Sequence, residues 1–141
     1  MLCHYEEITR KIIAAAIEVH RYLGPGLLEI AYQTCLAAEL EEAKLEYQRE
    51  VIVPLTYKNR KLDCGFRIDF LVENVVVLEL KSTEGISPAH ESQILSYLRF
   101  MDKQVGLILN FNEPVLKKGI RRFVLDSRSK GYSLTPGRVP S

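Results

Sequence analysis

Apolar residues recur every three or four positions near the start of the chain, which is the spacing of an amphipathic helix. The repeat covers residues 5–23 and predicts a first helix there. Gly24-Pro25-Gly26 then ends it, because proline cannot continue a helix and glycine permits a sharp turn. A second helix is predicted from Leu27 or Leu28 through EIAYQTCLAAELEEAK.

The middle of the chain changes to a strand pattern. YQREVIVPLTYK and LDCGFRIDFLVE are rich in β-branched and aromatic residues, and the polar KNRK between them predicts a hairpin. Pro54 predicts that the first strand lies at a sheet edge or carries a bulge. The nearly unbroken apolar run in VVVLELK, residues 75–81, predicts a central strand that is covered on both faces.

The last third of the chain predicts one more helix and further strands. Ser87 and Pro88 are typical of a helix start, so PAHESQILSYLRFMD should be helical. QVGLILNF is then a buried strand and IRRFVL a further strand. The order helix, helix, three strands, helix, one or two strands predicts an α/β fold with a mixed central sheet flanked by helices. We assign residues 1–126 to a single domain and the small, polar, proline-containing residues 127–141 to a flexible tail.

Composition narrows the class of protein. Charged residues make up 26% of the chain and hydrophobic residues 47%, a balance typical of a soluble globular domain. We found neither an apolar stretch that could span a bilayer nor a signal-peptide core, so we expect a cytoplasmic protein without membrane contact. The three cysteines include no CxxC pair, so neither a disulfide framework nor an iron–sulfur cluster is expected.

Charge is nearly balanced overall but unevenly distributed. The net charge of +1 gives no strong general attraction to nucleic acid. Residues 117–130 nevertheless contain six basic side chains and one acidic one. A solvated basic edge explains this segment, and the functional interpretation is a phosphate-contacting rim that includes Lys117, Lys118, Arg121 and Arg122.

The end of the predicted central strand turns from apolar to charged. Side chains alternate across a strand, so Glu79 and Lys81 share one face, and buried charges there need a partner or a metal. Asp69 on the preceding strand faces Glu79 only if the connection has an odd number of residues, such as a three-residue loop at 73–75. A two-residue loop would pair Asp69 with Leu78 and separate the carboxylates.

Two interpretations of these charges are open at this point. Converging carboxylates suit Mg²⁺ or Mn²⁺, and a neighbouring lysine can position water or stabilise negative charge during phosphodiester hydrolysis. A cross-strand ion pair of Asp69 or Glu79 with Lys81 or Arg67 explains the same residues and is common in sheets. Spacing alone favours the ion pair, because the pattern is short.

The same residues also resemble a known signature. Asp69 followed by Glu79-Leu80-Lys81 is similar to the D…(D/E)xK motif of the PD-(D/E)XK nuclease superfamily, whose core order is αβββαβ. Ile68 stands where the name of the signature has proline. The resemblance extends from about residue 12 to residue 125 and implies a restriction-endonuclease-like αβββαβ core.

Further motifs strengthen this resemblance. GLLEIAY, residues 26–32, is similar to the GxxExxY motif that names a bacterial and archaeal family assigned to that superfamily. GFRID, residues 65–69, resembles the strand on which that family carries its aspartate. Gln93 and Tyr97 match the QxxxY helix motif of the RecB-like branch.

The resemblance implies a role for each matching residue. Asp69 and Glu79 would bind the metal, with help from the backbone carbonyl of Leu80. Glu29 would be an additional ligand or would bind a metal-bound water, although the helix dipole alone also favours an acid at a helix start.

The other matching residues would act beside the metal. Lys81 would act on the water or on the scissile phosphate, while Gln93 and Tyr97 would orient the phosphate, a nucleobase or the lysine. Tyr97 could also be a core residue, and Tyr32 is expected to pack in the core.

Together these observations predict an Mg²⁺-dependent nuclease whose expected substrate is DNA before RNA. The alternative is a nuclease-fold binding or scaffold protein with weak or no catalysis. Near-zero net charge favours that alternative, because such a protein would need a partner or a homodimer to hold a duplex.

Overall fold

The computed structural model describes residues 2–125, and their side chains from Tyr5 onward, so the predicted tail lies outside the described residues. The elements are, in order, α1 (Leu2–Leu23), α2 (Glu29–Glu42), β1 (Tyr47–Ile52), β2 (Leu55–Tyr57), β3 (Arg60–Leu62), β4 (Arg67–Val72), β5 (Val76–Lys81), α3 (Pro88–Met101), β6 (Val105–Asn110), the 3₁₀ helix η1 (Leu116–Gly119) and β7 (Ile120–Val124).

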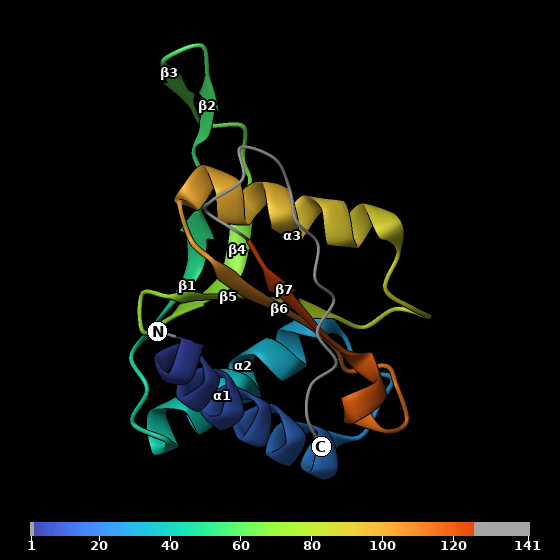
Figure 1. The fold of residues 1–141 in the computed structure, drawn as a ribbon. Helices are drawn as coiled ribbons and strands as arrows, with labels where there is room; N and C mark the ends of the chain where they lie inside the picture. Colours follow the sequence, from blue (N-terminus) through green and yellow to red (C-terminus); the bar gives the residue numbers. More distant parts are fainter. Residues whose placement is uncertain (1, 126–141) are drawn as a thin grey trace.

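Five strands form one mixed sheet in the order β1-β4-β5-β6-β7. Strands β5 and β6 run parallel, and the other neighbours are antiparallel. Helices α1 and α2 cover one face and α3 covers the other (Figure 1). This architecture confirms the predicted α/β fold and is consistent with a restriction-endonuclease-like fold.

The core consists of two apolar layers, one on each side of the sheet. The layer under α1 and α2 includes the fully buried Ile12, Leu36, Phe70, Leu78 and Leu80. The layer under α3 includes the fully buried Ile68, Val77, Ile94, Leu98 and Ile108. Because β5 contributes to both layers, its prediction as a central, doubly covered strand is confirmed.

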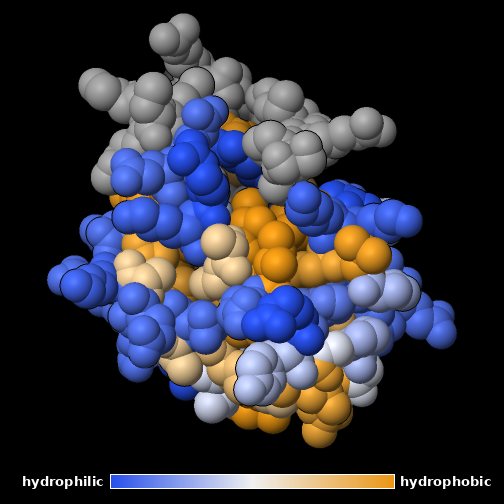
Figure 2. All heavy atoms as spheres, turned by 90° about the horizontal axis from the view of Figure 1, so that it is seen from below, coloured by the Kyte–Doolittle hydropathy of each residue, from blue (hydrophilic) through white to orange (hydrophobic). Residues whose placement is uncertain are grey.

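The surface on the side of α1 and α2 is mixed. Figure 2 shows that side largely covered by hydrophilic residues, with hydrophobic residues exposed between them. Large exposed apolar side chains at the start of α2 are Leu27, Leu28 and Ile30. Within residues 2–125, no helix is both long enough and apolar enough to cross a bilayer.

The predicted hairpin is confirmed, but each of its two runs is divided into two strands. β1 pairs with β4, whereas β2 and β3 form a separate two-stranded sheet that projects beyond α3 (Figure 1). The first run breaks at Pro54, as expected for an edge strand, because proline has no N–H to donate. The second run breaks near Gly65, which adopts a φ of +81° and donates its N–H to Oδ1 of Asp63.

Candidate active site

The register of β4 and β5 brings the two predicted carboxylates together. Phe70 lies opposite Leu78, which leaves residues 73–75 as a three-residue loop. Two of these loop residues, the predicted asparagine among them, adopt left-handed φ angles of 51° and 58°. Continued by one step, the register sets Asp69 opposite Glu79, so the odd-numbered loop that this pairing requires is present.

Beyond the Phe70–Leu78 pair, the side-chain carboxylates take the place of backbone carbonyls as acceptors between β4 and β5. Glu79 Oε1 accepts the backbone N–H of Asp69 at 3.3 Å. Asp69 Oδ2 accepts the backbone N–H of Leu80 at 2.7 Å. The N–H and C=O of one strand residue point to the same side, so the Leu80 carbonyl also faces the gap between the strands. The two carboxylates and the Leu80 carbonyl therefore lie at one corner of the sheet, where β4 and β5 separate.

Burial raises the pKa of both acids. Glu79 is only 6% exposed, and burial raises its pKa to about 8, with repulsion from Asp69 adding to the effect and Lys81 opposing it. The pKa of Asp69 is also raised, first by burial and then by repulsion from Glu50 and Glu29, while the Leu80 N–H opposes the rise. Ionising both acids in this buried position therefore costs free energy, and a bound cation would reduce that cost.

Lys81 lies beside Glu79 on the same strand. Its Nζ is 3.8 Å from Glu79 Oε2, and its side chain is largely buried. The ion pair that the simpler interpretation predicted is thus present in part. It joins Lys81 and Glu79 along β5 rather than across strands. Burial and the charge of Asp69 raise the pKa of Glu79, which weakens this ion pair near neutral pH.

Glu29 approaches the cluster from the start of α2. It is the first residue of that helix and is exposed, and its charge contributes to the raised pKa of both Asp69 and Glu79. The helix begins later than predicted, with Leu28 as an N-cap whose side chain makes no capping hydrogen bond. An acid at this position is favoured by the helix dipole, and it adds negative charge beside the carboxylate cluster.

The tyrosine of the GxxExxY motif holds the turn that presents Glu29. Tyr32 is fully buried, as predicted, and its hydroxyl donates to the Gly24 carbonyl at 2.6 Å and accepts the Leu27 N–H at 3.1 Å. Ser82 follows β5 and donates its hydroxyl to the Leu27 carbonyl at 2.6 Å. The turn between α1 and α2 is therefore fastened both to α2 and to the segment that follows Lys81.

Replacing Tyr32 by phenylalanine should keep the ring stacked on Phe111 but remove both hydroxyl bonds. We expect a loss of about 1–2 kcal/mol in unfolding free energy and a several-fold weaker affinity of the carboxylate cluster for Mn²⁺. Urea unfolding and metal titration measure the two effects. Tyr47→Phe is the matched control, because its hydroxyl bonds Glu41 far from the cluster. An equal effect of both variants on Mn²⁺ affinity would contradict the assigned role.

Sequence analysis missed a group on β1 and α2 that borders the cluster. Glu50 has an unusual left-handed φ of 52° and contributes to the raised pKa of Asp69. Its Oε1 accepts a hydrogen bond from Gln33 Nε2 at 3.1 Å, and Gln33 Oε1 accepts one from Arg49 at 2.7 Å. The only sequence signal was the spacing of four residues between Glu29 and Gln33, which sets both on one side of α2.

Helix α3 contributes only one of its two predicted residues to the interior. Tyr97 is buried, and its pKa is raised first by burial and then by Glu79 and Asp69. Its ring lies 5.9 Å from that of Phe66. Gln93, one turn earlier, is exposed. The matching motif therefore does not bury both residues against the carboxylates.

The predicted basic rim is divided by the geometry of β7. Lys117, Lys118 and Arg121 are exposed, whereas Arg122 is half-buried. Arg121 and Arg122 are neighbours on one strand, so their side chains point to opposite faces. β6 separates β7 from β5, which carries Glu79.

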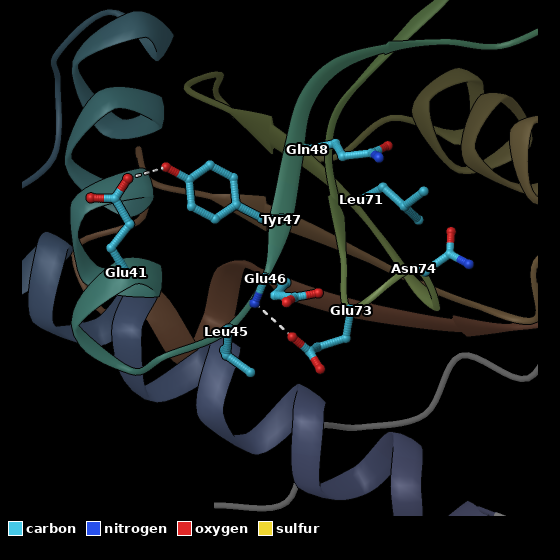
Figure 3. A pocket seen from close by; sticks show the side chains of 8 residues that line it. All are labelled: Glu41, Leu45, Glu46, Tyr47, Gln48, Leu71, Glu73 and Asn74. Atoms are coloured by element: carbon cyan, nitrogen blue, oxygen red, sulfur yellow. Dashed lines mark hydrogen bonds between the residues drawn. The ribbon is translucent and has the colours of Figure 1, made fainter.

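A separate pocket of about 630 Å³ lies at the other end of β4, beside the loop that joins β4 to β5 (Figure 3). It is lined by Glu41, Leu45, Glu46, Tyr47, Gln48, Leu71, Glu73 and Asn74. Two hydrogen bonds of 2.6 Å, from the Tyr47 hydroxyl to Glu41 and from the Glu46 N–H to Glu73, fix its acidic walls. Three glutamates without a basic partner in this lining make the pocket unsuitable for phosphate.

The oxygen donors at the corner suit a hard divalent cation. Within residues 2–125, no group of three or more His, Cys, Asp or Glu side chains is arranged to hold a metal ion. Two carboxylates and the Leu80 carbonyl do not resemble a closed zinc cage. They fit Mg²⁺ or Mn²⁺, which bind through one or two carboxylates and keep several waters.

Comparison with known proteins identifies the family. The family model described as the PD-(D/E)XK nuclease superfamily matches residues 6–123. Comparisons with curated proteins and with solved structures gave no significant match. The matched range includes α2, the sheet and α3, and with them Glu29, Asp69, Glu79 and Lys81. The chain therefore belongs to the PD-(D/E)XK nuclease superfamily.

Proposed function

We propose that the protein is a nuclease that uses Mg²⁺ or Mn²⁺ to hydrolyse phosphodiester bonds in DNA. Membership of the superfamily suggests nuclease activity and implies nucleic-acid binding, and nucleases of this superfamily generally use divalent metals such as Mg²⁺. The observation that carries the proposal is the convergence of Asp69 and Glu79 in a buried corner beside Lys81.

Asp69, Glu79 and the Leu80 carbonyl would hold the metal. Each carboxylate already accepts one backbone N–H, which orients it and leaves its other oxygen for the cation. When bound, the metal supplies positive charge to the phosphate and lowers the pKa of a bound water. Glu29, at the edge of the cluster, would bind a metal-bound water or complete the coordination.

The remaining residues would act on the phosphate. The Lys81 ammonium group would stabilise the negative charge that develops on the scissile phosphate and orient the attacking water. The buried Tyr97 would position the substrate or Lys81 through its hydroxyl. Gln93, being exposed, would contact the nucleic acid from the rim of the site.

We also propose that the chain belongs to the GxxExxY family and to the RecB-like branch. The first proposal is supported by a structural role for each motif residue: Gly26 adopts a φ of +96° in the turn, Glu29 opens α2, and Tyr32 bonds the turn. The second is supported by Gln93 and Tyr97 alone, and the exposure of Gln93 makes it the weaker of the two.

The experiment that tests the function offers the purified protein several substrates in Mg²⁺, in Mn²⁺ and in EDTA. Supercoiled plasmid reveals internal cuts, end-labelled linear duplex reveals cutting from the ends, and single-stranded DNA and RNA reveal the strand and sugar preference. We expect metal-dependent cleavage of DNA that EDTA abolishes. Absence of cleavage of all four substrates by the folded protein would contradict the proposal.

The second candidate function is a nuclease-fold scaffold that acts with a protein partner or as a homodimer. The net charge of +1 favours it, because the chain as a whole does not attract DNA. Titration with Mn²⁺ separates the two functions. A nuclease should bind Mn²⁺ in a way that Glu79→Gln abolishes, whereas a scaffold without chemistry has no reason to keep such a site.

The predicted basic rim would provide a secondary contact to DNA. Lys117, Lys118 and Arg121 are exposed and bring three positive charges to the edge of the sheet. Arg121 lies on β7, two strand positions from β5, which suits it to DNA that flanks the cut rather than to the scissile phosphate, and Lys117 and Lys118 precede it on η1.

A further inference from the structure

The β2–β3 hairpin is the part of the molecule that the catalytic site leaves unexplained. Among residues 2–125 its two strands pair only with each other, and the ribbon projects from the body of the protein (Figure 1). Residues 56–67 are all exposed. A two-stranded hairpin without a covered face is marginally stable in water, so its retention as a projecting arm calls for a binding partner.

The hairpin has a compact turn and a strongly positive tip. Tyr57 pairs with Arg60, so Lys58 and Asn59 alone form the turn, with left-handed φ angles of 46° and 68°. This two-residue turn matches the natural twist of a ribbon and fixes the tip. The segment LTYKNRKL, residues 55–62, contains three basic residues and no acid, against a net charge of +1 for the whole chain.

Exposed apolar side chains accompany these charges. Tyr57 is 57% exposed and has the Lys58 ammonium group 5.5 Å from the centre of its ring. Leu62 is 40% exposed. Basic side chains interleaved with an aromatic ring on one projecting element are typical of a surface that binds nucleic acid.

The base of the hairpin lies next to the carboxylate cluster. The Val53 N–H donates to the Phe66 carbonyl at 2.9 Å and closes the ribbon where it meets the body. The Phe66 ring lies 5.9 Å from Tyr97, whose pKa is raised in part by Glu79 and Asp69. Asp69 itself is the third residue of β4, the strand that continues from the hairpin. A nucleic acid held by the arm is thereby held beside the site.

We propose that the β2–β3 hairpin is an arm that enters the major groove of duplex DNA and contacts the flanking phosphates through Lys58, Arg60 and Lys61. A two-stranded ribbon fits a groove about 12 Å wide and about 8.5 Å deep. Three residue pairs extend about 10 Å, enough to reach into that groove. The choice of DNA rests on the proposed nuclease function, but the contact itself is measurable without cleavage.

The test compares triple variants that each remove three positive charges. The hairpin variant is Lys58→Asn, Arg60→Gln and Lys61→Gln. The matched control is Lys44→Asn, Arg10→Gln and Lys11→Gln. All three residues are exposed: Arg10 and Lys11 lie on α1, and Lys44 follows α2. Lys44 matches Lys58 in having a left-handed φ, 59°. The third variant changes the rim residues Lys117, Lys118 and Arg121 to Gln. Fluorescence anisotropy with a labelled 30-base-pair duplex, in EDTA at about 50–200 mM KCl, gives Kd and its salt dependence.

The hairpin variant should bind the duplex at least about tenfold more weakly than wild type. The slope of log Kd against log salt should fall by about 2.7, the value for three phosphate contacts. The matched control should bind within about twofold of wild type. Equal binding by the hairpin variant, a loss as large in the matched control, or a loss confined to the rim variant would overturn the proposal. Tighter hairpin-dependent binding of the single strand would overturn the assignment to duplex DNA.

Cleavage in Mg²⁺ separates failure of this inference from failure of the proposed function. If wild type binds DNA through the hairpin but does not cut, the nuclease proposal fails and the arm stands. If wild type cuts and the hairpin variant cuts with an unchanged KM, the arm fails and the nuclease stands. We expect the hairpin variant to have a raised KM and a nearly unchanged kcat.

Discussion

Replacing Lys81 by methionine should lower the rate of DNA cleavage about a hundred- to a thousandfold at neutral pH. The ammonium group lies 3.8 Å from Glu79 Oε2 in a largely buried position, where a positive charge interacts strongly with a neighbouring phosphate. Methionine preserves most of the volume of the lysine stem, so the fold should persist. Single-turnover cleavage measured with excess enzyme gives the rate directly.

Lys81 also acts on Glu79, and the test must separate the two effects. Its charge opposes the rise in the pKa of Glu79, so its loss raises that pKa further and weakens metal binding at neutral pH. The cleavage rate is therefore measured again at pH 9 with saturating Mg²⁺. A deficit that persists there supports a direct role for Lys81 on the phosphate. Full recovery at pH 9, or normal cleavage at pH 7, would contradict that role.

The metal-free protein should lose stability as the pH rises from about 5 to about 8. Glu79 has an ordinary pKa of 4.5 when unfolded and about 8 when folded, so the folded state holds the proton more tightly in this window. Stability is therefore greatest below the unfolded pKa and is lost as the pH approaches the folded pKa. The difference corresponds to an upper limit of about 5 kcal/mol, and the raised pKa of Asp69 acts in the same direction.

Glu79→Gln and added metal provide the controls for this prediction. Glutamine cannot ionise, so the variant should show a much flatter dependence of unfolding free energy on pH in EDTA. At pH 8, Mg²⁺ should restore stability to wild type, because a bound cation favours the ionised carboxylates, and should have little effect on the variant. Urea unfolding at four or five pH values measures both effects. A wild-type stability that rises between pH 5 and 8 in EDTA would exclude the raised pKa.

The position of the carboxylates followed from the sequence because strand geometry allows few alternatives. Side chains alternate with a period of two, so Asp69 and Glu79 can share a face only if an odd number of residues joins the strands. The loop at 73–75 satisfies that condition, with asparagine in a left-handed conformation. Strand alternation thus stated the condition for this half of the site, and the resemblance to the D…(D/E)xK motif, rather than spacing alone, favoured a metal site there.

Other features depended on tertiary contacts that no local pattern reports. The run containing Pro54 is β-rich on both sides, so its division into a sheet strand and a projecting arm was not predicted. Nothing in the sequence around Glu50 marks its left-handed backbone. The hydroxyls of Tyr32 and Ser82 both hydrogen-bond the turn between α1 and α2, although these residues are far apart in sequence. Such contacts appear only in the folded chain.

The most direct test of the central claim adds Mg²⁺ to DNA that is already bound. Wild type and Glu79→Gln are each added in excess to a labelled duplex in EDTA, and anisotropy confirms that the duplex is bound. Excess Mg²⁺ then starts the reaction. We predict that both proteins bind the duplex and that only wild type cuts it, after the metal is added. Equal cutting by the variant, or no cutting by wild type bound to DNA in Mg²⁺ or Mn²⁺, would contradict a metal-dependent nuclease centred on Asp69 and Glu79.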